Sequence, residues 1–290
     1  VTFTKKATTI KSNFQQKCWD ATRNFFFHRF AQDERDGIKA NSLTYQTGKF
    51  AGNPHGREQI GFIPWYFNLP DAGFESAWKF LMDTNYFYSP YGPTTVEKMD
   101  PLYNVARNCC AWSGNAWPFA TSQTLKAMAN LLRNYQQNYV TKKDYFKMLD
   151  NFANTHLKDG VPYIGEANHP ETGSWSGHDH IGHSEHYFHS SYIDLVISGL
   201  MGIQSKETDS IEVDPLIPDE WDYACLENIK YHGNDITLIW DKTGKKYNKG
   251  KGLLLFSNGK KIASSPVVKK IKVPLKYRIK TDTPKLVNYA

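Results

Sequence analysis

The sequence has few cysteines and no long apolar run, and each scarcity excludes a class of protein. The four cysteines among 290 residues, Cys18, Cys109, Cys110 and Cys225, include no pair with the CxxC spacing of a zinc or redox site. We therefore expect packing roles for them and no disulfide framework. No apolar run is long enough to span a membrane. Phosphate-binding glycine loops, GxSxG elbows and Cys/His nucleophile contexts are also missing.

A basic stripe tied to a nucleic-acid-binding module is missing as well, although the formal net charge is +6. The lysines concentrate in residues 242–252 and 267–280. In the second of these segments they alternate with Val, Ile and Leu, which is typical of the solvated face of strands. We expect neither a nucleic-acid partner nor a membrane partner.

Aromatic residues are abundant, with 8 Trp, 17 Tyr and 17 Phe. Aromatic rings suit protein cores, interfaces and sugar-binding clefts, so their number alone does not choose between these uses. The hydrophobic share of 40% and the charged share of 22% are ordinary for a globular protein of one or two domains.

Helical periodicity dominates the first part of the chain. An amphipathic helix is predicted over residues 4–19, and residues 59–69 suggest a buried helical turn or two. Asp71 is positioned to cap a helix that runs to Leu81.

Two further helices carry local start signals and a third has a stop signal. Pro118 suits the first turn of a helix reaching Tyr135, and Thr141 with Asp144 resembles a capping box. A last helix is expected over residues 184–200, ending at Gly202.

From about residue 208 the pattern changes to short alternating segments separated by turns. Residues 257–260, Ser-Asn-Gly-Lys, are a type I′ hairpin signal. The sequence therefore predicts a mainly α fold with a C-terminal β-domain. We divide it into a helical domain of residues 1–205 and a small antiparallel β-domain of residues 206–290.

Glu166 is the candidate catalytic residue. It lies in the segment EANHPETG, where Pro170 and Gly173 can hold a turn and fix the carboxylate over a cleft. The alternative is an ordinary solvated loop glutamate.

A histidine-rich segment follows Glu166 and raises the possibility of a metal site. Its members are His178, His180, His183, His186 and His189. No HExxH motif is present and no second cluster supplies further ligands, so we expect no metal and no cofactor. We interpret the segment as the polar rim of a cleft, in which His189 bonds substrate or Glu166.

The element WSGNAWP places two indoles five residues apart around small residues, just before a helix. Trp112 and Trp117 are either core residues or the walls of a sugar subsite. The same two alternatives apply to Trp65, Tyr66 and Tyr91.

Four stretches in order resemble the catalytic region of (α/α)6-barrel (six-hairpin) glycoside hydrolases. They are Gly61-Phe62-Ile63-Pro64, Tyr91-Gly92-Pro93-Thr94-Thr95, Trp112 to Pro118, and Glu166 to Gly173. The closest groups are glycoside hydrolase family 63 and the mannosylglycerate-hydrolase-like enzymes. The resemblance covers about residues 57–202, and the β-domain is similar to the sandwich that often follows such barrels.

The resemblance implies an inverting, exo-acting glycosidase in which Glu166 is the general base. It also implies a substrate cleft lined by Trp65, Tyr66, Tyr91, Trp112, Asn115, Trp117 and His189. About half of the barrel's twelve helices are found, all matching its later part, and nothing in residues 1–50 resembles the family's aspartate motif. We therefore expect the N-terminal half of the same barrel, and the general acid, to lie upstream of Val1. Alone, the chain should show little hydrolysis.

Two alternatives remain open at this point. The first is a non-catalytic carbohydrate-binding protein that uses the same aromatic cleft, and the second is a histidine-rich metal protein. The sequence does not specify the sugar, the linkage or the anomer. A periplasmic or secreted location is the one we favour.

Overall fold

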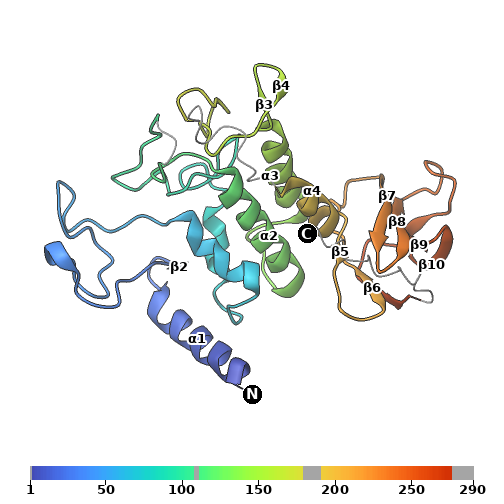
Figure 1. Cartoon of the computed structure of the whole chain (residues 1–290), viewed down its shortest axis with the longest axis horizontal. Coiled ribbons are helices and arrows are strands. Elements are labelled where there is room, and N and C mark those ends of the chain that lie inside the picture. The colour runs from blue at the N-terminus through green and yellow to red at the C-terminus, as the bar shows by residue number, and fades with distance from the viewer. Residues whose placement is uncertain (1, 108–110, 179–190, 276–290) are drawn as a thin grey trace, which may run out of the picture. The chain divides into compact units, whose positions relative to one another are not determined.

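The computed structural model describes residues 2–107, 111–178 and 191–275, which form two compact units (Figure 1). The first unit is Val1–Tyr192 and the second is Ile193–Ala290. The division predicted at 205/206 falls inside the second unit. The reason is that Ile197, Met201 and Ile203 pack into the apolar core of the β-strands that follow.

The first unit is built from helices joined by long loops. Its α-helices are α1 (Thr2–Cys18), α2 (Pro118–Asn134) and α3 (Lys142–Asn154). Its 3-10 helices are η1 (Arg35–Gly37), η2 (Gln59–Phe67) and η3 (Glu75–Phe80). Two short hairpins pair β1 (Trp19–Asp20) with β2 (Phe25–Phe26), and β3 (Leu157–Lys158) with β4 (Val161–Pro162).

The predicted N-terminal helix is confirmed as α1, but the predicted cap at Asp71 is wrong. The Asp71 carboxylate forms an ion pair with Lys11 and accepts a 3.0 Å hydrogen bond from Gln15, both on α1. Gly73 then adopts a φ of +113°. The left-handed turn breaks the chain before η3, which begins only at Glu75.

The predictions for α2 and α3 are confirmed. Pro118 occupies the first turn of α2, where its missing N–H costs nothing. Thr141 Oγ1 accepts a hydrogen bond from the Asp144 backbone N–H at 3.2 Å. In return, Asp144 Oδ2 accepts one from the Thr141 N–H at 2.8 Å. Aspartate therefore completes the capping box that usually contains Glu or Gln.

An aromatic core lies beneath η2 and η3. Phe25, Phe62 and Phe87 are fully buried, with the Phe25 and Phe62 ring centroids 5.1 Å apart. The Trp65 and Trp78 rings, both fully buried, meet edge to face at 5.6 Å. Such pairs combine a large buried apolar area with a favourable quadrupole geometry.

The second unit begins with a helical segment. The short α4 (Tyr192–Asp194) spans the division and continues into a π-helical turn, η4 (Leu195–Leu200). Residues 192–200 of the helix predicted over 184–200 are thus helical, Ser191 is not, and residues 184–190 lie outside the described residues. Gly202, with a φ of +77°, follows the C-cap residue Met201, as the C-terminal glycine signal predicted.

Two antiparallel sheets follow. Their strands are β5 (Ile203–Gln204), β6 (Ser210–Val213), β7 (Tyr223–Tyr231), β8 (Asn234–Asp241), β9 (Gly252–Ser257), β10 (Lys260–Ser265) and β11 (Ile271–Pro274). The strand orders are β10-β9-β8-β7 and β11-β6-β5. Asn258 and Gly259, with φ of 49° and 74°, form the predicted type I′ turn.

The two sheets share one apolar core, to which Ile211, Leu238 and Leu255 contribute fully buried side chains. Within the described residues, no helix combines the length and the apolar character that a membrane crossing requires.

Candidate active site

The loop that carries Glu166 is hydrogen-bonded to the Trp112–Pro118 element. Asn168 and Ala116 exchange two backbone hydrogen bonds, of 3.0 and 2.9 Å. The Tyr91 N–H donates to the Pro170 carbonyl at 3.0 Å. Three of the stretches on which the family resemblance rests therefore meet in space, although they are far apart in the sequence.

This pairing extends over four chain segments. Single antiparallel bridges join Glu58 to Val96, Thr94 to Ala116, and Ala116 to Asn168. We call residues 57–59, 94–97, 115–117 and 166–169 the bridged array. The array lies directly before η2 and α2, at the point where two long loops enter these helices.

Glu166 is 9% exposed, which makes it a buried carboxylate. Its neighbour Ala167 is fully buried and packs against Trp117 and Ala120 of α2.

The preceding Gly165 sits against the Trp175 indole, where an added Cβ would lie 2.9 Å from the ring. Trp175 is itself fixed, since its Nε1–H donates to the Thr155 and Leu157 carbonyls at 3.1 Å each. A rigid wall therefore stands on the N-terminal side of Glu166.

Trp112 and Trp117 form a stacked pair with ring centroids 4.1 Å apart. Trp117 is 4% exposed and donates its Nε1–H to the Ala111 carbonyl at 2.9 Å. Trp112 covers it and remains 51% exposed. Of the two indoles, only that of Trp112 offers a face to a sugar in this structure.

The other predicted site residues are placed differently. Asn115 is fully buried, and its Nδ2 donates to the Ala106 carbonyl at 3.1 Å. Trp65 belongs to the aromatic core and has no accessible face. Tyr66 is 37% exposed, but its ring packs against Phe67 on η2. Tyr91 is half-buried against Gly173, where a Cβ would approach its ring to 2.5 Å.

The histidine-rich segment is only partly described. The His178 side chain is buried, with its ring perpendicular to that of His169 at a centroid distance of 5.6 Å. His189, together with His180, His183 and His186, lies outside the described residues. Within the part of the chain that is described, no three His, Cys, Asp or Glu side chains are grouped as metal ligands would be.

Sequence reasoning did not include His28 in the site, and it gave Glu58 at most a substrate-binding or structural role. Glu58 belongs to the bridged array, and its Oε2 lies 2.7 Å from His28 Nδ1. Both side chains are about half exposed, at 45% for Glu58 and 48% for His28. Thirty residues separate the two in the sequence. The available signal was the position of Glu58 immediately before the apolar segment that contains Gly61-Phe62-Ile63-Pro64.

The hydrogen bond with Glu58 raises the pKa of His28 above its ordinary value, despite an opposing effect of burial. His55, whose ring centroid is 5.4 Å away, is the other titratable group beside His28. Burial lowers the pKa of His55, and the charge of His28 lowers it further.

We expect Glu58→Gln to lower the pKa of His28, measured from its ring-proton NMR shifts across pH 4–9. An unchanged His28 pKa would show that the pair does not form in solution. While Glu58 is ionised, the stabilising effect of the pair is fully present below the ordinary histidine pKa, and it is lost as the pH rises through the raised pKa of His28.

Comparisons with known proteins match both units. The model of the mannosylglycerate hydrolase MGH1-like glycoside hydrolase domain matches residues 1–190. That of the glycosyl hydrolase family 65 C-terminal domain matches residues 207–263. A solved structure titled "Sialidase" is 38% identical, with a TM-score of 0.80 over 93% of this chain. The match covers 24% of that chain, so the sequence spans about a quarter of the length of this solved relative.

Proposed function

Because the chain belongs to the mannosylglycerate hydrolase MGH1-like glycoside hydrolase family, we propose that it contributes the general base, Glu166, to hydrolysis of a glycosidic bond. The observation that carries the proposal is the position of Glu166. It is a buried carboxylate on a loop that is hydrogen-bonded to the backbone of Ala116, next to Trp117, and flanked by the Trp175 wall. Loop carboxylates held this rigidly suit proton transfer better than packing.

In the proposed reaction, Glu166 takes a proton from water as the water oxygen attacks the anomeric carbon. The bond from this carbon to the leaving oxygen breaks, and an acid protonates that oxygen. An inverting enzyme separates its two carboxyl groups by about 6.5–9.5 Å to admit the water. Exo action would release one terminal sugar in each turnover.

Three carboxylates of the first unit are already bound by hydrogen-bond donors, and we do not assign the role of acid to them. Glu97 pairs with Arg57 at 2.7 Å. Asp100 accepts hydrogen bonds from the Tyr45 hydroxyl and from the Leu102 N–H. Burial raises the pKa of Glu171, but hydrogen bonds from Lys98 and Ser89 outweigh this effect and lower it. We propose that the acid belongs to a segment of the protein outside these 290 residues.

The order of elements in the first unit supports an (α/α)6 toroid. Long loops lead from α1 to η2 and from η3 to α2, and a third follows α3 and is described as far as residue 178. The bridged array joins residues from all three loops, as expected when alternate connections of helical hairpins meet at one end of a barrel. We propose that this unit is the later half of such a barrel and that an N-terminal half completes the cleft.

The stereochemical outcome tests the proposal. In the protein that contains this chain, we expect the first sugar released from a glycoside to have the inverted anomeric configuration. Proton NMR during the first minutes, before mutarotation, measures it. Release of the retained anomer would show that water does not attack the anomeric carbon of the substrate directly, which contradicts the proposed reaction.

The alternative of a non-catalytic carbohydrate-binding protein is not favoured, because the matching models for both units describe domains of hydrolases.

A further inference from the structure

The His28–Glu58 pair has no role in the proposed proton transfer. Glu58 is the residue immediately before η2, where an acidic side chain could cap the helix, yet it makes no capping hydrogen bond. Its carboxylate instead meets the His28 imidazole, and both groups remain about half exposed. The pair thus presents an acceptor and a donor to solvent from one rigid end of the first unit.

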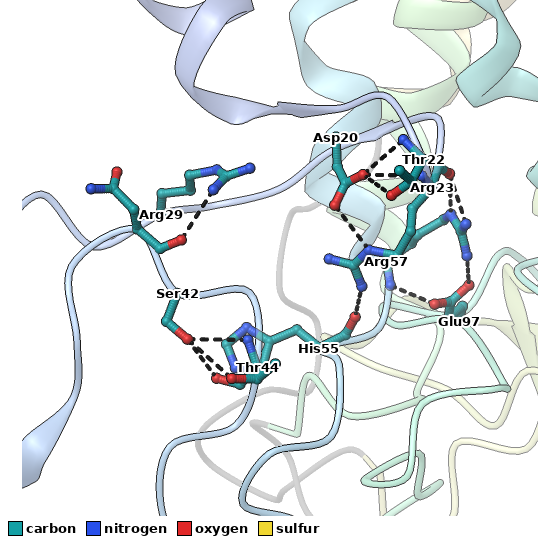
Figure 2. A network of polar contacts seen from close by, with 10 residues as sticks. Asp20, Thr22, Arg23, Arg29, Ser42, Thr44, His55, Arg57 and Glu97 are labelled. Carbon is teal, nitrogen blue, oxygen red and sulfur yellow. Dashed lines mark hydrogen bonds and ion pairs between the residues drawn. The ribbon is translucent and has the colours of Figure 1, made fainter.

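The chain that precedes Glu58 is fixed at consecutive residues. Arg23 donates a hydrogen bond to the His55 carbonyl (Figure 2). The Gly56 N–H donates to Asp100 Oδ2 at 2.5 Å, and a Cβ at this glycine would collide with the same carboxylate. Only glycine therefore permits this close approach.

Arg57 adds further anchors. Its N–H and its guanidinium donate to the two oxygens of Glu97 at 2.8 and 2.7 Å, and the guanidinium also reaches the Arg23 carbonyl (Figure 2). On the other side of Glu58, the Gln59 N–H donates to the Thr95 carbonyl at 2.9 Å. The backbone of Glu58 is therefore held on both sides.

The stability of the fold does not explain the His28–Glu58 pair, because an exposed ion pair contributes little to the free energy of unfolding. Preorganised polar groups on a fixed backbone are instead what ligand recognition requires. The bridged array also connects the pair to the candidate base. Neighbouring strands lie about 4.8 Å apart, so the Glu58 segment is roughly 14 Å from the Glu166 segment. A substrate of more than one sugar unit covers that span.

Building on the proposed function, we infer that His28 and Glu58 form a second sugar subsite, which binds vicinal hydroxyl groups of a neutral glycosyl unit. The Glu58 carboxylate accepts a hydrogen bond from one hydroxyl, and the remaining imidazole nitrogen of His28 bonds to the next. This unit lies further along the same oligosaccharide than the one attacked at Glu166.

The charged groups around the proposed His28–Glu58 subsite favour a neutral sugar over a sugar acid. Glu58 and Glu166 would both repel a substrate carboxylate. Among the described residues of this network, the guanidiniums of Arg23 and Arg57 are already paired, with Asp20 and Glu97 (Figure 2).

Calorimetric titration of the protein that contains this chain tests the inference, with neutral thio-linked di- and trisaccharides, which are not hydrolysed, and sialyllactose as probes. We expect Glu58→Gln and His28→Gln each to weaken binding of the preferred neutral oligosaccharide about tenfold. The matched control is Asp33→Asn, which removes another exposed ion pair of the same loop, with Lys39 at 2.9 Å. It should leave the affinity unchanged.

Three outcomes would overturn the inference: equal affinity in the two variants and the wild type, stronger binding of sialyllactose, or no binding of a neutral sugar. Kinetics in the protein that contains this chain separate the inference from the proposed function. Glu58→Gln should lower kcat/KM for an oligosaccharide but not for an aryl monoglycoside. If the Glu166→Gln variant hydrolysed the substrate at the full rate, Glu166 would not be the general base. The titration result for the His28–Glu58 subsite would be unaffected.

Discussion

Glu166→Gln is expected to lower kcat for glycoside hydrolysis by roughly a hundred- to ten-thousandfold in the protein that contains this chain. Glutamine keeps the shape of the side chain but cannot take a proton from water. Because glutamine fills the same volume as the buried glutamate, the fold should be retained. Steady-state rates measure the loss, and calorimetry should show that substrate binding persists.

The matched control is Glu171→Gln, five residues further along the same loop. Glu171 pairs with Lys98 and Ser89 near the surface and has no part in the proposed proton transfer. We expect its kcat to equal that of the wild type. If Glu166→Gln retained the wild-type rate, a different residue would have to activate the water.

Phe25→Ala should lower the free energy of unfolding of the first unit by about 3–5 kcal/mol. The Phe25 ring is fully buried and meets the rings of Phe62 and Phe87 at centroid distances of 5.1 and 5.9 Å. It also packs against Gly61, where there is no room for a Cβ. Truncation therefore leaves a cavity among large rigid rings that cannot close around it. Urea titration followed by tryptophan fluorescence measures the loss.

Phe3→Ala provides the control for the loss of a phenyl ring as such. Phe3 is 85% exposed on α1, so its removal should leave the unfolding midpoint unchanged. A comparable destabilisation by both variants would mean that the aromatic core described here does not hold the first unit together.

Elements with local signals were predictable from the sequence. Pro118 and the Thr141–Asp144 capping box specify where α2 and α3 begin, because the groups involved are neighbours in the chain. The cap expected at Asp71 failed for the opposite reason. Its carboxylate is bound by Lys11 and Gln15, a tertiary contact that no local pattern reveals.

The candidate site likewise contains residues that the sequence identifies and residues whose placement only the structure reveals. The loop of Glu166 was found from its turn residues and from the family resemblance, and its role as base stays a prediction. The sequence does not distinguish the roles of Trp112 and Trp117. Only the stacked geometry shows which of them covers the other. Trp65 could not be recognised as a core residue, because burial depends on helix packing. The pairing of His28 with Glu58 depends on how a long loop folds back, which periodicity does not encode.

The bridged array also has a consequence for the order of folding. Its bridges, Glu58–Val96, Thr94–Ala116 and Ala116–Asn168, close loops of 38, 22 and 52 residues. The entropy of closing such loops must be overcome before the new contacts stabilise anything, so the array forms after the capped helices α2 and α3. During synthesis, the segment at Ala116 emerges well before its partner at Asn168, and its strand edge stays open in the interval. The residues proposed to bind and hydrolyse sugar are thus among the last parts of this unit to come together.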